Sequence, residues 1–296
     1  MPTRTIAFIG LGAMGAAMAD TLIKKQFRVV GYDMRPEAVA HIKAAGGRGA
    51  ASVEEAARGA DTMVLMVVNA DQAEDVLFEK IGLESLKPGA TVILCSTCAP
   101  DRITEIARKV EKAGRKFVDA PVSGGVTGAR SGTLTIMAAA KKPVFEAAKP
   151  VLAAMGSNLF HLGEVPGQGA AMKVVNQLLC GVHIAVAAEG LAFAERSGID
   201  PKLALEILSG SAAQSWMLKA RGPRMVDYDD VVTSAVDIFV KDLSLVLDAG
   251  KGAKMGLPLA AVAHQLFLSA SGMGHGLEDD SQVIETYRAL AKKKHE

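Results

Sequence analysis

The chain has 296 residues, of which 50% are hydrophobic, 22% are charged and 4% are aromatic. This composition is typical of a globular protein, and the length allows one large domain or two ordinary ones. The formal net charge is +1, from 33 basic and 32 acidic residues. We therefore expect no nucleic-acid partner, because there is no basic excess to bind phosphates and few aromatic rings to stack on bases.

Cysteine usage also restricts the class of protein. Three cysteines in a chain of this length make no disulfide framework and suit a reducing compartment. Cys95 and Cys98 form a C-x-x-C, which we interpret as two small residues at a strand-to-loop junction; a thioredoxin-like redox pair is the alternative. Neither a second such pair nor a histidine pair follows at zinc spacing, so we expect no metal.

The N-terminus and the hydropathy pattern predict the location. The first apolar run, Ile6–Ile9, is too short for a signal peptide and ends in glycines. We find no continuous run of about 18 apolar residues and therefore expect no transmembrane helix and no membrane partner. A cytoplasmic location follows as the expectation.

Residues 5 to about 160 alternate short β-rich runs with alanine-rich helical patterns. The expected strands are Thr5–Ile9, Arg28–Tyr32, Thr62–Val67, Thr91–Leu94, Lys116–Asp119, Leu134–Ala138 and Leu159–Leu162. This alternation predicts an α/β fold with a Rossmann-like, doubly wound and mostly parallel sheet.

From Gly167 onward the pattern becomes helical. A long, almost uniformly apolar helix is expected from Gly169 to about Ser197. Further helices are expected over Pro201–Ser209, Ser215–Arg221, Val236–Lys254 and Leu257–Ala270, and a last one from about Ser281 into the charged tail at Lys292–Lys294. We predict a dinucleotide-binding domain over residues 1–165. An all-helical substrate and dimerisation domain would cover 166–296 and begin with the long helix.

The stretch GLGAMG, at residues 10–15, follows the first strand directly and opens a helix. In this context Gly10 allows a tight turn, Gly12 lets the backbone approach a pyrophosphate, and Gly15 lets the helix pack closely on the strand. The helix N-terminus offers free N–H groups to the phosphates. We expect cofactor contacts along the whole loop, that is from Gly10, Leu11, Gly12, Ala13, Met14 and Gly15.

Polar residues follow the next strands at the same edge of the sheet. Asp33 ends the second strand, where a carboxylate accepts hydrogen bonds from the adenosine ribose and repels a 2′-phosphate, which favours NAD over NADP. Arg35 weakens this preference, because an arginine can pair with that phosphate. Asn69 and Thr97 follow later strands and are candidate cofactor contacts, with Thr97 near the nicotinamide ribose.

Two other stretches are candidates for the substrate site. Ser123, Gly124 and Gly125 follow a strand and a proline, and their backbone N–H groups with the serine hydroxyl suit a carboxylate. Lys173 is an isolated cation on the long apolar helix, with Asn176 and Gln177 one turn further on. A buried lysine needs partners or a function, and desolvation would favour its neutral, basic form.

Four stretches together resemble the 3-hydroxyisobutyrate dehydrogenase family, also called the β-hydroxyacid dehydrogenases. They are residues 8–19 around the glycine loop, 119–134 around Ser123, 167–176 around Lys173, and 241–243. Their order and spacing match over nearly the whole chain. The resemblance implies that Lys173 is the catalytic acid/base, that Asn176 assists it and contacts substrate with Gln177, that Ser123–Gly125 hold the substrate carboxylate, and that Lys241 reaches the cofactor, with Asp242 orienting it.

Finer features resemble the L-threonate dehydrogenase branch of this family. They include residues 67–70, 181–184, 215–217, 234–242 and 278–281. Ser234 stands where some relatives carry a phenylalanine, which implies a roomier and more polar pocket. The open alternatives are 3-hydroxyisobutyrate dehydrogenase, or a tartronate semialdehyde, succinic semialdehyde or glyoxylate reductase. A non-catalytic dinucleotide-binding module is the alternative of another class.

Some features have no assigned role at this point. The resemblance implies a homodimer or homotetramer that pairs through the long helix. His183 lies ten residues after Lys173 and is expected on another side of that helix, as a core histidine. The roles of His275 and Trp216 stay open.

Overall fold

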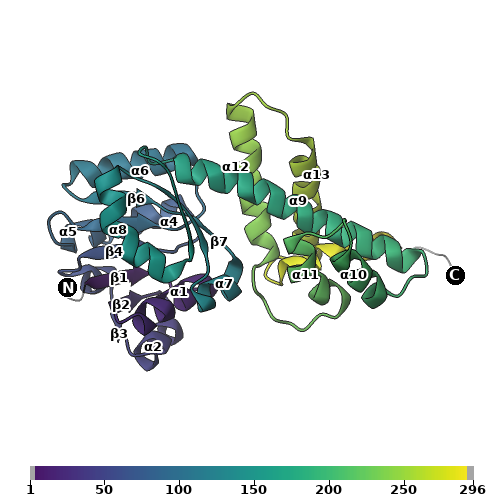
Figure 1. The fold of residues 1–296 in the computed structure, drawn as a ribbon, viewed down its shortest axis with the longest axis horizontal. Helices are drawn as coiled ribbons and strands as arrows, with labels where there is room; N and C mark the ends of the chain where they lie inside the picture. Colours follow the sequence, from purple (N-terminus) through teal and green to yellow (C-terminus); the bar gives the residue numbers. More distant parts are fainter. Residues whose placement is uncertain (1–3, 292–296) are drawn as a thin grey trace. The chain divides into compact units, whose positions relative to one another are not determined.

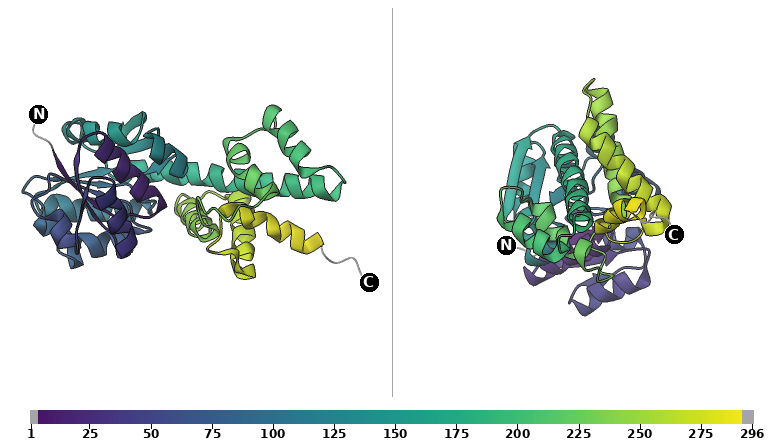
Figure 2. Two further views of the ribbon diagram at one scale, coloured as in Figure 1. Left: turned by 90° about the horizontal axis from the view of Figure 1, so that it is seen from below. Right: turned by 90° about the vertical axis from the view of Figure 1, so that its right-hand side faces the viewer.

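The computed structural model describes residues 4–291, so the expected charged tail lies outside the described residues. The chain divides into two compact units, Met1–Lys173 and Val174–Glu296, which we call the N-terminal unit and the C-terminal unit. The helix α9 (Gln168–Arg196) is continuous across the division, as Figure 2 also shows.

The N-terminal unit is built on one mostly parallel sheet (Figure 1). Its strands are β1 (Thr5–Ile9), β2 (Arg28–Tyr32), β3 (Arg48–Gly49), β4 (Thr62–Leu65), β5 (Thr91–Leu94), β6 (Lys116–Asp119), β7 (Val122–Ser123), β8 (Thr135–Ala139) and β9 (Asn158–Gly163). The order is β3-β2-β1-β4-β5-β6-β8-β7, with β9 beside β8. Pairing is parallel from β3 to β6 and between β8 and β9; β8 pairs antiparallel with β6 and β7.

Helices cover both faces of this sheet. They are α1 (Ala13–Lys24), α2 (Pro36–Ala44), α3 (Val53–Ala57), α4 (Ala70–Glu74), the π-helix η1 (Asp75–Glu79), α5 (Gly82–Ser85), α6 (Pro100–Lys112), α7 (Gly125–Ser131) and α8 (Lys142–Met155). Because side chains alternate along a strand, each strand contributes to two cores. Phe8 packs in the core under α1, α2 and α8, whereas Ile9 packs in the core under α3, α4 and α6.

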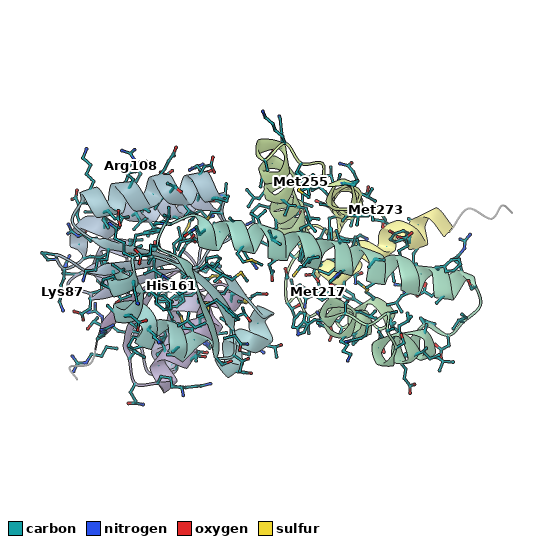
Figure 3. The ribbon with its side chains drawn as sticks, turned by 45° about the horizontal axis from the view of Figure 1, so that its top comes forward. Lys87, Arg108, His161, Met217, Met255 and Met273 are labelled. Atoms are coloured by element: carbon teal, nitrogen blue, oxygen red, sulfur yellow. The ribbon has the colours of Figure 1, made fainter. Side chains whose placement is uncertain are left out.

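The edge strand β9, which carries His161 (Figure 3), is attached to α8 by an aromatic contact. The ring of His161 stacks on Phe145 with centroids 4.2 Å apart, and His161 Nε2 donates to the Ala140 carbonyl at 2.8 Å. The His161 imidazole therefore packs against the last strand and helix of the sheet and stabilises this edge.

The C-terminal unit is helical. After α9 follow α10 (Pro201–Gly210), α11 (Trp216–Val226), α12 (Val236–Gly252), α13 (Pro258–Ala270), the π-helix η2 (Ser271–His275), the 3₁₀ helix η3 (Asp280–Ile284) and α14 (Glu285–Ala291). They enclose a separate core in which Phe239 of α12 stacks on Phe267 of α13 at 5.1 Å.

The predicted α/β class and the seven predicted strands are confirmed. The strands β3 and β7 were not predicted, since two residues each are too few for a periodic pattern. It also expected one last helix, but this segment begins with the 3₁₀ turn of η3, where buried Asp279 and Asp280 replace a regular apolar pattern.

The helix α9 bears on the expectation that no transmembrane helix is present. Its 29 residues are long and apolar enough by length and composition, with a mean hydropathy of 1.5 in the most apolar window. Half of that window is buried inside the chain, and the core helix of a globular protein passes the same test.

Candidate functional site

The glycine loop between β1 and α1 has the shape that a pyrophosphate needs. Gly10 has φ +91°, and a Cβ there would lie 2.4 Å from the Met66 carbonyl oxygen; a Cβ on Gly15 would lie 1.9 Å from the Gly10 oxygen. A side chain at either position would clash with a backbone oxygen, so both positions require glycine. A Cβ on Gly12 would meet only Arg35, at 3.9 Å, so this glycine leaves open space beside the first turn of α1.

The carboxylate of Asp33 is bound directly to this loop. Its Oδ2 accepts from the Leu11 N–H at 2.7 Å, and its Oδ1 accepts from Arg35 Nε at 2.9 Å. Arg35 Nη2 donates in turn to the Leu11 carbonyl at 3.2 Å. Burial works to raise the pKa of Asp33, but the hydrogen bonds from Arg35 and Leu11 outweigh it and the pKa is lowered. The anion therefore lies beside the space at Gly12, under a half-exposed arginine.

The loops after β4 and β5 are joined to each other. Ser96, which was not among the predicted site residues, is buried, and its hydroxyl accepts from the Val67 N–H at 3.0 Å. Asn69 begins α4 as its N-cap, with Oδ1 accepting from the Gln72 N–H at 2.9 Å. Thr97 lies half-buried next to Ser96. The two predicted cofactor contacts thus come from loops that the Ser96 hydroxyl holds in register.

The C-x-x-C pair does not form a redox pair in this structure. Both cysteines are buried thiols. Cys95 packs in the core on one face of the sheet and Cys98 in the core on the other. Burial raises the pKa of Cys95 to about 12, so its thiol is protonated and unreactive at neutral pH. The interpretation as small residues at a strand end is therefore the better one.

Ser123, Gly124 and Gly125 form the turn from β7 into α7. Both glycines have positive φ, +126° and +62°, and a Cβ on Gly125 would meet no atom within 4 Å. This backbone is one that L side chains rarely adopt, and it leaves room in front of the turn. It fits the predicted carboxylate cradle, to which Ser123 adds a half-buried hydroxyl.

The start of α9 is held by Asp119, a carboxylate that the sequence analysis did not single out. Its Oδ2 accepts from the N–H groups of Gly167, at 2.8 Å, and Ala170, at 3.0 Å. A Cβ on Gly169 would lie 2.9 Å from the same oxygen and 2.4 Å from the Met137 carbonyl oxygen. Burial raises the pKa of Asp119 to about 6, although these amides lower it. The sequence feature that could have identified Asp119 is its position at the end of a predicted strand, shortly before Ser123, Gly124 and Gly125.

Lys173 lies three residues after Ala170 on the same helix, and it is 7% exposed. At about 100° per residue, Asn176, Gln177 and Cys180 fall within about 60° of Lys173 around the helix axis. His183 falls outside this face and is half-buried, as expected. The helix therefore presents one lysine and two amides along one side.

In the C-terminal unit these amides are part of a hydrogen-bonded chain. Asn176 Nδ2 donates to Gln177 Oε1 at 2.9 Å, and Gln177 Nε2 donates to Asp242 Oδ2 at 2.5 Å. Asp242, 2% exposed, forms an ion pair with Lys241, whose Nζ lies 2.7 Å from Oδ1. The predicted residues Asn176, Gln177 and Lys241 are thus linked through Asp242.

Ser234 precedes α12 and is held by a second buried network. Its carbonyl accepts from the Asp280 N–H at 2.7 Å. Arg221 makes a bidentate pair with Asp280, with Nε–Oδ1 at 2.6 Å and Nη2–Oδ2 at 3.1 Å. Arg224 pairs with Asp279 at 3.0 Å. Asp279 and Asp280 lie in one of the stretches that carry the family resemblance, but nothing in the sequence pattern identified Arg221 and Arg224 as their partners.

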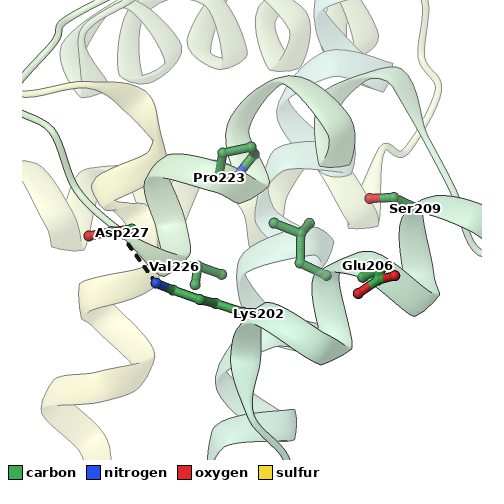
Figure 4. A pocket seen from close by; sticks show the side chains of 7 residues that line it. Lys202, Glu206, Ser209, Pro223, Val226 and Asp227 are labelled. Atoms are coloured by element: carbon green, nitrogen blue, oxygen red, sulfur yellow. Dashed lines mark hydrogen bonds and ion pairs between the residues drawn. The ribbon is translucent and has the colours of Figure 1, made fainter.

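Other candidate features do not join these groups. His275 Nδ1 lies 2.8 Å from Glu278 Oε2, and Trp216 is 57% exposed at the start of α11. A hollow of about 330 Å³ lies between α10 and α11, where Lys202 and Asp227 pair at 3.5 Å (Figure 4). None of the predicted site residues lines it. Residues 4–291 contain no group of three or more His, Cys, Asp or Glu side chains that could hold a metal.

The fold and the glycine loop define a dinucleotide-binding enzyme, and comparisons with known proteins identify its family. A model described as the NAD-binding domain of 6-phosphogluconate dehydrogenase matches residues 5–163. A second, described as the NAD-binding domain of NADP-dependent 3-hydroxyisobutyrate dehydrogenase, matches residues 167–287.

Individual relatives match along almost the whole chain. The L-threonate dehydrogenase of Cupriavidus necator is 43% identical over 289 residues, covering 97% of both chains. That of Haemophilus influenzae is 40% identical, covering 98% of this chain and 97% of its own. A crystal structure described as 3-hydroxyisobutyrate dehydrogenase from Salmonella typhimurium is 41% identical with a TM-score of 0.92, covering 96% of this chain and 99% of that one.

The chain therefore belongs to the 3-hydroxyisobutyrate dehydrogenase family. The predicted enzyme class, a nicotinamide-dependent oxidoreductase acting on hydroxy acids, and the predicted dinucleotide cofactor are confirmed.

Proposed function

We propose that this enzyme oxidises L-threonate with NAD to 2-dehydro-L-erythronate, and that Lys173 is its general acid/base. The substrate is supported by the names of the relatives at 39–43% identity, which are L-threonate dehydrogenases. The observation that carries the mechanism is the buried position of Lys173 on the same side of α9 as Asn176. A desolvated amine there suits proton transfer.

The roles of the chain's residues follow from their chemistry. When bound, the dinucleotide supplies the hydride acceptor for the carbinol carbon. Lys173 takes the hydroxyl proton as the carbonyl forms and returns it in the reverse direction. The N–H groups of Ser123–Gly125 hold the substrate carboxylate, and Asn176 hydrogen-bonds the substrate beside the lysine. Ser234, with its small hydroxyl, makes room for a polyhydroxy acid.

The NAD preference is supported by Asp33. Its carboxylate lies beside the open space at Gly12 and would repel a 2′-phosphate there. Lys241 is the proposed cofactor contact from the C-terminal unit, and Asn69 and Thr97 are those from the loops after β4 and β5.

A second substrate is 3-hydroxyisobutyrate, which the description of the 41% identical crystal structure favours. The test is a panel of hydroxy acids with NAD or NADP, followed by NADH or NADPH formation. L-threonate should give the highest kcat/KM, and Ser234→Phe should lower it. Activity confined to 3-hydroxyisobutyrate would contradict the substrate, and unchanged L-threonate turnover in Ser234→Phe would contradict the role of Ser234.

The same assay tests the mechanism. Lys173→Ala should lower kcat by about 10²- to 10⁴-fold, which is the usual contribution of a general acid/base. Lys149→Ala, which removes a half-exposed lysine of α8, is the matched control and should keep full activity. Wild-type turnover in Lys173→Ala would refute the assignment.

We also propose that the enzyme is a homodimer or homotetramer, in the cytoplasm and without a membrane or nucleic-acid partner. The support is an apolar stripe on α9, where Val175 and Leu179 are each 50% exposed, Val186 is 56% and Phe193 is 73% exposed. Spacings of four and seven residues place them along one side, as in helix pairs. A monomer by light scattering at micromolar concentration would contradict this proposal.

A further inference from the structure

The amide of Asn176 has a defined orientation, because Asp242 determines the direction of every hydrogen bond between them. An aspartate carboxylate in an ion pair with Lys241 can only accept, so Gln177 must turn its NH₂ group toward it. Gln177 Oε1 then faces Asn176 and can only accept, so Asn176 must turn its own NH₂ group inward. Amide orientations are often ambiguous, but here an anion resolves both.

Both hydrogens of the Asn176 amide have an acceptor in this arrangement. Nδ2 donates to Gln177 Oε1 at 2.9 Å and to Cys180 Sγ at 3.3 Å. Within residues 4–291, the Asn176 oxygen Oδ1 accepts no hydrogen bond. Asn176 therefore offers an acceptor to whatever lies in front of it.

The close packing of two helices holds this chain of bonds together. A Cβ on Gly181 of α9 would lie 2.8 Å from Leu243 Cδ2 of α12. Gly181 is one turn after Gln177, and Leu243 follows Asp242. The glycine thus lets the helices approach closely enough for the short contact between Gln177 and Asp242, which water cannot reach because both side chains are buried.

We propose that Asp242 and Gln177 are positioning residues that turn the Asn176 carbonyl oxygen toward the substrate, so that the site accepts a hydrogen bond from a substrate hydroxyl. The proposal rests on the proposed function, since it takes Asn176 as a substrate contact. It also changes the role of Gln177, which the sequence analysis placed in contact with substrate and which here acts through Asn176. An acceptor at this position favours a hydroxy acid over an analogue that lacks the hydroxyl, because the oxygen would then lose its partner.

Reversing the direction of the bonds tests the proposal. Asn176→Asp should lower kcat/KM by about 100-fold or more, since two carboxylates then face one glutamine and the geometry is lost. Asp242→Asn alone should lower it by about 10- to 100-fold, as is typical when a group that orients a site residue is removed. In the double variant the amide at position 242 donates to Gln177 Oε1, and Gln177 Nε2 donates to the carboxylate at position 176. An acceptor oxygen faces the substrate again, so the double variant should be at least about tenfold more active than Asn176→Asp.

A second pair of variants covers the case in which the double variant does not fold. Gln177→Glu places two carboxylates in contact and should lose activity, whereas adding Asp242→Asn lets both amides donate to the new carboxylate and should restore most of it. Asp248→Asn, an exposed aspartate on the same helix, is the matched control and should keep wild-type kcat and KM.

The outcomes separate this proposal from the proposed function. If the wild type oxidises a hydroxy acid and Lys173→Ala abolishes turnover, the proposed function stands. If, in that same enzyme, neither double variant regains activity over its single parent, the positioning roles of Asp242 and Gln177 are refuted. Recovery in either pair supports them when denaturant unfolding shows that the single variants are fully folded under the assay conditions, because the rescue then restores the geometry of the site and not the amount of folded enzyme.

Discussion

In the N-terminal unit the buried carboxylate of Asp119 is held by backbone amides, and among residues 4–291 no arginine or lysine pairs with it. In the C-terminal unit the buried carboxylate of Asp280 faces the guanidinium of Arg221 in a bidentate pair. Both side chains are almost inaccessible to water, at 1% and 0% exposure.

Desolvation raises the pKa of both carboxylates, and the two environments oppose it by different means. Amides at the start of a helix satisfy an anion with partial charges, so desolvation still raises the pKa of Asp119. Burial also raises the pKa of Asp280 to about 6, although the charge of Arg221 works to lower it, and Asp280 raises the pKa of Arg221 even though burial works to lower that. Both carboxylates can therefore respond to pH, but Asp280 has a charged partner whose removal would leave it uncompensated, whereas Asp119 depends on backbone amides that no side-chain substitution removes.

The largest effect is expected where the ion pair is broken. Arg221→Met leaves Asp280 as an uncompensated buried charge and should cost about 3–5 kcal/mol in the free energy of unfolding. Replacing both partners, as in Arg221→Met with Asp280→Leu, should recover most of this loss. Denaturant unfolding measures both. The exposed pair provides the control, since Lys202→Met should cost about 0–1 kcal/mol.

A loss below about 1 kcal/mol in Arg221→Met would contradict the comparison. It would mean that water reaches Asp280 or that the loop before α12 rearranges to solvate it. The Ser234 carbonyl, which accepts from the Asp280 N–H, would then not be held as described.

The second prediction concerns Asp119 and pH. Its pKa is raised to about 6 from an ordinary value of 3.8, so the folded state holds the proton more tightly than the unfolded chain. The resulting stability is fully present below about pH 4 and is lost as the pH rises through about 6. Relative to Asp119→Asn, the wild type should therefore lose up to about 3 kcal/mol between pH 4 and 7.5. Parallel stability curves for the two proteins would refute this.

A smaller effect of opposite sign is expected at Asp33. The pKa of this carboxylate, whose side chain is 13% exposed, is lowered, so its stabilisation is present above the ordinary pKa and is lost as the pH falls through the folded value. Asp33→Asn should cost about 0–1 kcal/mol at neutral pH, as for other surface ion pairs. The difference from wild type should shrink in acid, whereas the difference for Asp119→Asn should change in the other direction.

Cofactor preference provides a second measurement on the same variant. Asp33→Asn removes the like charge and releases Arg35, so the NADP to NAD ratio of kcat/KM should rise by about tenfold or more, the scale of one hydrogen bond to a charged group. Adding Arg35→Ala should remove this gain. An unchanged ratio would show that neither side chain contacts the adenosine ribose.

Much of the fold and part of the site could be predicted from the sequence. Local patterns carry that information: short β-rich apolar runs predict the strands, and the spacing of Gly10, Gly12 and Gly15 between a strand and a helix predicts the loop. Lys173 was recognisable as an isolated cation on an apolar helix. The networks around Asp119 and Asp242 were not, since their partners lie 51 and 65 residues away in the chain.

By itself, the sequence determined the order of strands and helices, the dinucleotide loop and the face of α9 that carries Lys173, Asn176 and Gln177. These follow from short-range geometry, in which side chains three or four residues apart share a helix face. Only the tertiary structure decided whether each polar side chain turns its donor or its acceptor atom toward its neighbours and the substrate. A carboxylate gains a fixed direction for its hydrogen bonds only when another element brings a donor to it, as α9 brings Gln177 to Asp242. That contact depends on Gly181 packing against Leu243, a long-range fit that no local pattern records.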